Sequence, residues 1–218
     1  MSEYRDGGRF SYSLTLAPHL SDFMMNSLAV YCGSSPGDDP IYREAARTLG
    51  VVLAEREIRL VYGGGSIGLM GIVADAVLAG GGEVVGVITE HLRDKELGHG
   101  GLTELRVVGT MHERKAVMAD LADAFCALPG SIGTLEEIAE VMVWTQLGLQ
   151  SKACGVLNVN GYYDHLIAMI DKMVGERFLH QQHRDALVVA ADPAEMVEKL
   201  VNAEVRYHDK WLHGEERR

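Results

Sequence analysis

The sequence predicts one α/β domain built around a doubly wound, mainly parallel β-sheet. Short runs rich in valine, isoleucine and leucine alternate along the chain with stretches in which apolar residues recur at helical spacing. A helix between successive strands makes each connection a crossover, and crossovers join parallel strands. The 218 residues, of which 47% are hydrophobic and 23% charged, suit a single globular domain.

The expected strands are the apolar runs. In each run the apolar residues occupy consecutive positions rather than alternate ones, which is typical of strands buried on both faces of a sheet. Such runs occur at residues 28–32, 59–62, 84–88, 105–108, 124–128, 154–159 and 187–189.

The expected helices are bounded by local signals. Asp39 precedes Pro40, so an N-cap residue is followed by proline at the first helical position. Thr110 and Glu113 have the spacing of a capping box, and the glycines at 80–82 form a helix stop. Helices are expected at residues 40–53, 70–79, 111–119, 134–147, 163–174 and 193–203.

The two ends of the chain differ in composition from the rest. Residues 1–25 are polar and aperiodic and are expected to form a flexible extension, residues 26–207 the domain, and residues 208–218 a charged tail. No apolar run reaches the roughly 20 residues that span a bilayer, and the start lacks the apolar core of a signal peptide. The expected location is the cytoplasm, without a membrane partner.

Charge and composition narrow the classes of ligand. The net charge of −11 disfavours nucleic acid as a partner, because its phosphate backbone needs a basic surface. An anionic small molecule would need a local positive patch. Cys32, Cys126 and Cys154 are odd in number and lie in apolar segments, so buried free thiols are expected. The sequence has no His-x-x-x-His or Cys-x-x-Cys pair, and no metal site is expected.

The loops at the carboxyl ends of the strands hold the candidate ligand-binding residues, because ligands bind there in open α/β sheets. The loop from Gly63 to Gly68 has the pattern G-x-G-x-x-G between a strand and a helix, and Glu90 lies near the end of the next strand. This pattern favours a dinucleotide. Its position argues against one, since the fingerprint normally occupies the first strand-to-helix turn, here residues 32–37. In the alternative interpretation these glycines only allow the helix to pack closely.

A second glycine loop, residues 129–137, leads from a predicted strand into a predicted helix. Gly130 and Gly133 let backbone N–H groups turn toward one point without a side chain in the way. Thr134 is expected either to cap the helix or to donate its hydroxyl to an anion. The N–H groups and partial positive charge of a helix start predict phosphate as the ligand. Glu137, one turn into this helix, is expected to reach across the pocket floor.

The third feature is the segment Met-His-Glu-Arg-Lys at 111–115, which places two cations at the start of a capped helix. Cations at a helix start cost about 0.3–1 kcal/mol. A bound anion, or an ion pair between Arg114 and Glu137, would offset that cost. A solvated helix face is the alternative for both Arg114 and Lys115.

The segments at 111–115 and 129–137 together resemble the signatures of the LOG family. This family comprises the cytokinin riboside 5′-monophosphate phosphoribohydrolases, which are often mislabelled as lysine decarboxylases. Its paired signatures, M-x-x-R-K and P-G-G-x-G-T-x-x-E, stand here as MHERK and PGSIGTLEE. Further segments similar to the family lie at residues 31–37, 63–71, 144–148 and 157–163.

The resemblance implies a homodimeric Rossmann-like enzyme that needs no cofactor. Its substrate would be a cytokinin riboside 5′-monophosphate, which is an N6-substituted AMP, or AMP itself. Hydrolysis of the N-glycosidic bond would release the free base and ribose 5-phosphate. The family's essential arginine and glutamate map onto Arg114 and Glu137, the expected catalytic pair. The expected substrate-binding residues are Ser34, Gly64, Gly65, Glu96, Met111, Lys115, Gly130, Ser131, Ile132, Gly133 and Thr134.

One residue departs from the family loop: Ser131 stands where the family has its second glycine. If this position requires a positive φ, serine is strained there. If it does not, the serine hydroxyl could add a contact to the phosphate.

Other functions compete with this hypothesis. They are a general purine 5′-mononucleotide nucleosidase, a non-catalytic carrier of a nucleotide-like cofactor on the same fold, and an NAD-dependent enzyme that uses the loop at 63–68. Lysine decarboxylation has no support, because the sequence lacks a cofactor-holding lysine in a Ser-x-His-Lys type context.

Overall fold

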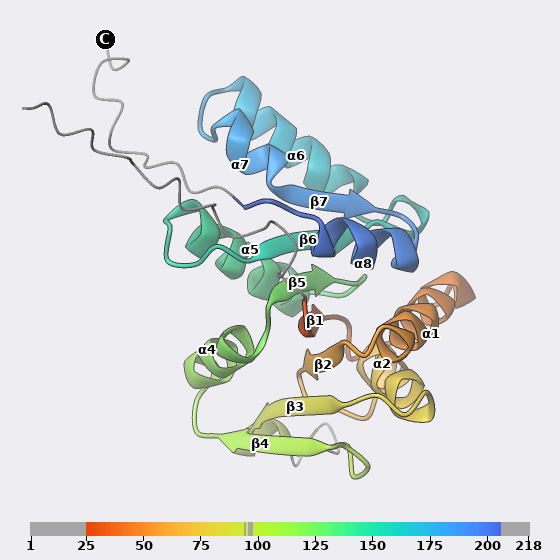
Figure 1. Cartoon of the computed structure of the whole chain (residues 1–218). Helices are drawn as coiled ribbons and strands as arrows, with labels where there is room; N and C mark the ends of the chain where they lie inside the picture. Colours follow the sequence, from red (N-terminus) through yellow and green to blue (C-terminus); the bar gives the residue numbers. More distant parts are fainter. Residues whose placement is uncertain (1–24, 94, 96–97, 206–218) are drawn as a thin grey trace, which may run out of the picture.

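The computed structural model describes residues 25–93, 95 and 98–205. Within these residues seven strands form one sheet in the order β4-β3-β2-β1-β5-β6-β7 (Figure 1). Every neighbouring pair is parallel, so the predicted α/β class and parallel sheet are confirmed. The strands are β1 (Ser27–Tyr31), β2 (Arg59–Tyr62), β3 (Val84–Thr89), β4 (Glu104–Val108), β5 (Ala124–Ala127), β6 (Ala153–Leu157) and β7 (Leu187–Ala190).

Helices cover both faces of the sheet (Figure 1). On one face α1, α2 and α8 enclose a core that includes Leu49, Val73 and Val197. On the other face α4, α5 and α6 enclose a core that includes Met118 and Ile138. The helices are α1 (Pro40–Glu55), α2 (Gly68–Ala79), α3 (Glu90–Arg93), α4 (Met111–Leu121), α5 (Ile132–Gln146), η1 (Val159–Gly161), α6 (Asp164–Gly175), α7 (Gln181–Asp185) and α8 (Pro193–Val201).

The ends of the chain fall largely outside the described residues. Residues 1–24, almost all of the predicted extension, and the whole predicted tail at 208–218 lie there. Among the residues that are described, no helix is long and apolar enough to cross a membrane.

The predicted caps are present and fix where two helices begin. The Asp39 carboxylate accepts a hydrogen bond from the N–H of Ile41 (2.9 Å), so α1 begins at the expected place. The Thr110 hydroxyl accepts one from the N–H of Glu113 (3.1 Å), and the Glu113 carboxylate in turn accepts one from the N–H of Gly109 (3.0 Å). Helix α4 thus begins at the expected place, although the carboxylate binds the residue before the N-cap and not the N-cap residue itself.

The expectation of burial on both faces is wrong for β4. Of its five residues only Val108 is buried. The strand lies at the edge of the sheet and pairs with β3 alone, so most of its side chains reach solvent. Arg106 pairs with Glu104 (2.6 Å between Nε and Oε1), and such charged side chains protect an exposed edge from pairing with other chains.

Three short helices and the starts of α2 and α5 differ from the predictions. Helix α2 begins at Gly68, two residues before its predicted start. Helices α3, η1 and α7 are too short to show helical periodicity, and the sequence did not predict them. Helix α5 begins at Ile132, two residues before the predicted start, with Ser131 as its N-cap residue. The capping role considered for Thr134 is therefore wrong, because Thr134 lies buried within the first turn.

The three cysteines are buried and free, as predicted. Cys32 and Cys126 lie in the core beneath α1 and α2, and Cys154 lies on the opposite face of the sheet. Burial raises the pKa of Cys126 and of Cys154 to about 12 and also raises the pKa of Cys32. All three are therefore thiols at neutral pH and unreactive, because the thiolate is the nucleophile.

Candidate active site

The candidate site lies where the strand order reverses. From β1 the chain builds outward through β2, β3 and β4, and then returns to place β5 on the other side of β1. The turns after β1 and β5 meet there, and the N–H of Gly33 donates to the carbonyl of Pro129 (3.2 Å). The N–H of Leu69 donates to the carbonyl of Gly33 (3.0 Å), which adds the turn after β2. This edge is where α/β sheets bind ligands.

The turn after β5 presents the start of α5 to this edge. The first hydrogen bond inside the helix runs from the N–H of Leu135 to the carbonyl of Ser131 (3.2 Å). The N–H groups of Ile132, Gly133 and Thr134 therefore have no acceptor within the helix and point out of its end. N–H groups at a helix start, together with the helix dipole, suit an anion such as phosphate, and phosphate binding here stays a prediction.

The two glycines of this loop have different roles. A Cβ on Gly130 would lie 2.1 Å from the Thr134 hydroxyl and 2.9 Å from the N–H nitrogen of Gly33, so the loop has no space for a side chain there. A Cβ on Gly133 would meet no described atom within 4 Å. Gly130 is required by packing, whereas Gly133 leaves the outer side of the helix start open.

Ser131 is not strained. Its φ of −96° and ψ of −160° are extended, and any residue adopts this conformation. The position therefore does not require the glycine of the family loop. The serine side chain is exposed and makes no capping hydrogen bond to the helix.

Arg114 is buried at the bottom of the site. Its Nε donates to the carbonyl of Val87, near the end of β3 (2.9 Å), and its Nη2 donates to the carbonyl of Gly63, after β2 (3.3 Å). A Cβ on Gly63 would lie 2.2 Å from that Nη2. Glycine at position 63 thus makes room for the guanidinium group.

Glu137 of α5 meets Arg114 from the other side. Nη1 of the arginine lies 3.4 Å from Oε1 of the glutamate, and their side chains are only 7% and 14% exposed. The expected ion pair is present. Buried charges are stable only when paired, so this pair holds a carboxylate at a fixed place near the start of α5.

Lys115 follows Arg114 on α4 but has different partners. Its ammonium group forms a hydrogen bond with the carboxylate of Glu136 and lies 3.0 Å from Oε2 of Glu140. Burial alone would lower the pKa of Lys115, but the two carboxylates raise it above its ordinary value. Lys115 thus ties α4 to α5 as a cation. Its contact with a substrate stays a prediction, and the sequence predicted neither Glu136 nor Glu140 as its partner.

The glycine turn at 63–68 faces protein atoms rather than an open cradle. In addition to the contact between Gly63 and Arg114, a Cβ on Gly68 would lie 2.2 Å from the carbonyl carbon of Ser34. Gly68 adopts a left-handed φ of 64°. The geometry favours close packing as the reason for these glycines over the binding of a dinucleotide.

The other predicted substrate-binding residues have different surroundings. Gly65 forms a β-bridge with Gly98, and Gly64, before it, has a φ of 78°. Met111 and Ile132 are 45% and 78% exposed, and the Met111 sulfur accepts a hydrogen bond from Nη1 of the buried arginine. Predicted contacts also include Glu96, which lies outside the described residues.

A cleft of about 260 Å³ opens beside residues 129–137, which we call the phosphate loop after the ligand predicted for it. Ser34 and Ser131 line it, and so do Tyr42 of α1 and Tyr162, which follows η1. The two tyrosine rings pack edge to face with centroids 5.7 Å apart. The sequence predicted no role in the site for Tyr162, which lies in the family-like segment at 157–163. Its place beside the loop depends on the neighbouring positions of β5 and β6, which local spacing does not reveal.

Comparison with known proteins shows the family to which the chain belongs. The family model described as "Possible lysine decarboxylase" matches residues 70–200. A probable cytokinin riboside 5′-monophosphate phosphoribohydrolase of Oryza sativa subsp. japonica is 53% identical over 79% of this chain and 76% of its own. A cytokinin riboside 5′-monophosphate phosphoribohydrolase of Arabidopsis thaliana is 49% identical over 84% of each chain. The chain belongs to the LOG family.

Solved structures of more distant proteins share the fold. The molybdenum cofactor carrier protein of Chlamydomonas reinhardtii has a TM-score of 0.62 at 19% identity, and the match covers 82% of this chain and 99% of that one. The molybdenum cofactor binding protein of Rippkaea orientalis has a TM-score of 0.61 at 18% identity, over 81% and 95%. Identities this low show the fold alone.

Alanine substitutions at Gly130 and Gly133 should have different effects on the stability of the protein. Gly130→Ala is expected to destabilise the protein by about 1–3 kcal/mol, because the added methyl group overlaps Thr134 and Gly33. Gly133→Ala is expected to leave stability unchanged or slightly raised, since alanine suits a helix better than glycine. Thermal unfolding of both variants measures this difference. Equal melting temperatures for the two would contradict the geometry of the loop.

Proposed function

We propose that this protein hydrolyses the N-glycosidic bond of cytokinin riboside 5′-monophosphates and releases the free base and ribose 5-phosphate. The observation that carries the proposal is the buried ion pair of Arg114 and Glu137, set one turn beyond the exposed helix start of α5. The named activity of relatives that are about half identical supports it. The proposed enzyme is cytoplasmic and uses neither a cofactor nor a metal ion.

The 5′-phosphate is held by the start of α5. Ile132, Gly133 and Thr134 supply N–H donors, and the helix dipole adds a partial positive charge. The ribose then extends from the phosphate toward the carboxylate of Glu137. This order would bring the glycosidic carbon near the buried pair of Arg114 and Glu137.

Glu137 acts on the bond that breaks. Cleavage of an N-glycosidic bond passes through an oxocarbenium-like state, and a carboxylate close to the ribose stabilises its positive charge or activates the attacking water. Arg114 orients Glu137 and favours its ionised form. The two carbonyls that bind the guanidinium group hold this arrangement rigid.

Replacing the carboxylate of Glu137 should lower the rate of hydrolysis without weakening the binding of AMP. Glu137→Gln is expected to lower kcat by about two to four orders of magnitude, because a neutral amide neither stabilises the cation nor activates water. The affinity for AMP, measured by calorimetry, should change little. Glu44→Gln, the same substitution at an exposed position of α1, is the control and should retain turnover. Near-normal turnover in Glu137→Gln would overturn the assignment.

A panel of substrates tests the proposed reaction itself. N6-isopentenyl-AMP, AMP and the two matching nucleosides are incubated with the protein, and released base is measured by chromatography. Base should be released from the 5′-monophosphates and not from the nucleosides, because the site binds the phosphate group. Equal rates with AMP and its N6-substituted form would instead indicate a general purine nucleosidase. Binding of a nucleotide without release of base would indicate a non-catalytic carrier. Tighter binding of NAD than of AMP would indicate an NAD-dependent enzyme.

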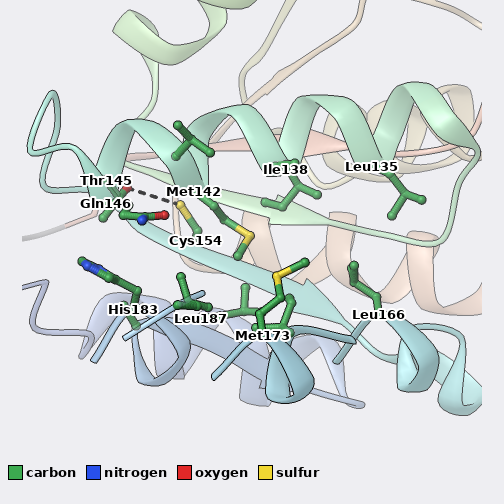
Figure 2. Close-up of a pocket in the computed structure, with 15 residues that line it drawn as sticks. Leu135, Ile138, Met142, Thr145, Gln146, Cys154, Leu166, Met173, His183 and Leu187 are labelled. Atoms are coloured by element: carbon green, nitrogen blue, oxygen red, sulfur yellow. Dashed lines mark hydrogen bonds between the residues drawn. The ribbon is translucent and has the colours of Figure 1, made fainter. Parts of the chain in front are cut away.

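The proposed enzyme works as a homodimer, as the family resemblance implies. A groove of about 330 Å³ lies between α5 and α6 (Figure 2). Ile138 and Met142 of α5 line it from one side and Met173 of α6 from the other. Val143, in the same groove, is 46% exposed, and Phe178, just beyond α6, is 84% exposed. Exposed apolar surface of this kind is typical of protein interfaces, and α5 connects it directly to Glu137.

A charge placed in this groove should dissociate the dimer. Val143→Glu is expected to elute as a monomer in size-exclusion chromatography with light scattering, whereas the unchanged protein elutes as a dimer. Val51→Glu is the matched control, because Val51 is 41% exposed but lies on α1, on the other face of the sheet. A monomeric unchanged protein, or a dimeric Val143→Glu variant, would contradict the proposed interface.

A further inference from the structure

The segment at 157–163 lies beside the phosphate loop, because β6 is the neighbour of β5 in the sheet. Asn158 holds the turn in shape, and its side-chain oxygen accepts a hydrogen bond from the N–H of Tyr163 (2.7 Å). Asn160 and Gly161 both adopt left-handed conformations, with φ of 51° and 70°. This reversal of the chain directs the two tyrosines that follow back toward β5.

Both tyrosine hydroxyls donate to backbone carbonyls, one just before the phosphate loop and one within it. The hydroxyl of Tyr163 donates to the carbonyl of Leu128 (2.6 Å) and is buried. The hydroxyl of Tyr162 donates to the carbonyl of Gly130, immediately before the N-cap residue of α5. These two hydrogen bonds fix the directions of both carbonyl groups.

The direction of a carbonyl also sets the direction of the next N–H. In a trans peptide the two groups of one planar unit point in opposite directions, and no described peptide bond is cis. The bond from Tyr162 to the carbonyl of Gly130 therefore orients the N–H of Ser131. In the same way, the bond from Gly33 to the carbonyl of Pro129 orients the N–H of Gly130.

We propose that Tyr162 is a positioning residue for phosphate binding, which acts by holding the Gly130–Ser131 peptide so that its N–H faces the anion site. Tyr163 fixes the entry of the same loop at Leu128. The inference rests on the proposed function, since it assigns the residue that prepares the phosphate subsite. It extends that function to a side chain outside both signature segments. The ligand group that Tyr162 affects is a phosphate monoester or inorganic phosphate.

The substitution Tyr162→Phe tests the role of the hydroxyl alone. Tyr162 is 42% exposed, so the variant keeps its ring packing and should unfold at the temperature of the unchanged protein. Loss of one hydrogen bond should raise KM for AMP roughly three- to tenfold. The inhibition constant for inorganic phosphate should rise by a similar factor. The value of kcat should stay close to normal, because the interaction acts equally on the ground state and the transition state.

Tyr42→Phe is the matched control. It removes a hydroxyl from the ring that packs edge to face on Tyr162. Among the hydrogen bonds of the described residues, none joins the Tyr42 hydroxyl to the phosphate loop. This variant should keep the KM and the phosphate inhibition constant of the unchanged protein. An equal effect of both substitutions would show a general disturbance of the cleft and would overturn the proposal.

The remaining outcomes also decide between the two proposals. Unchanged KM and phosphate inhibition in Tyr162→Phe, or a fall in kcat alone, would overturn the positioning role while the proposed hydrolysis stands. If the unchanged protein hydrolyses no substrate, calorimetry with inorganic phosphate replaces the kinetics, and weaker binding by Tyr162→Phe still supports the inference. A protein that neither hydrolyses substrate nor binds phosphate would overturn both proposals.

Discussion

A guanidinium group buried under the carboxyl edge of the sheet must find acceptors, and this requirement organises the site. Arg114 takes a carbonyl near the end of β3, a carbonyl after β2 and the carboxylate of Glu137 on α5. The turn after β2 has glycine where a side chain would displace the guanidinium group. One buried charge thus connects elements that are far apart in the chain, and loss of any acceptor would leave it incompletely paired.

The fold was predictable where the signals are local. Asp39 caps α1, the capping box of Thr110 opens α4, and consecutive apolar residues mark the central strands. The prediction failed for β4, because a strand's place at an edge depends on its partners and not on its own residues. It also failed for the start of α5. Ser131 is the N-cap residue there, but its side chain makes no capping hydrogen bond, so the usual sequence signal of a cap did not identify it.

The site was predictable in its chemistry but not in all of its contacts. Two signature segments led to Arg114 and Glu137, and the structure brings these side chains together. The sequence did not reveal that Lys115 is held by Glu136 and Glu140, since these side chains approach only when α4 and α5 pack side by side. Contacts of this kind arise from the order of strands in the sheet, which no spacing along the chain records.

The central position of β1 next to β5 also determines when the site can form. Beside this strand pair, the carboxylate of Asp123 accepts a hydrogen bond from the N–H of Asn26, 97 positions away in the chain. Contacts between such distant residues form slowly, because the entropy of closing the long loop is lost before they stabilise the chain. During synthesis, a chain that has emerged only as far as β4 therefore holds no anion site. The capacity to bind a nucleotide arises together with the completed sheet.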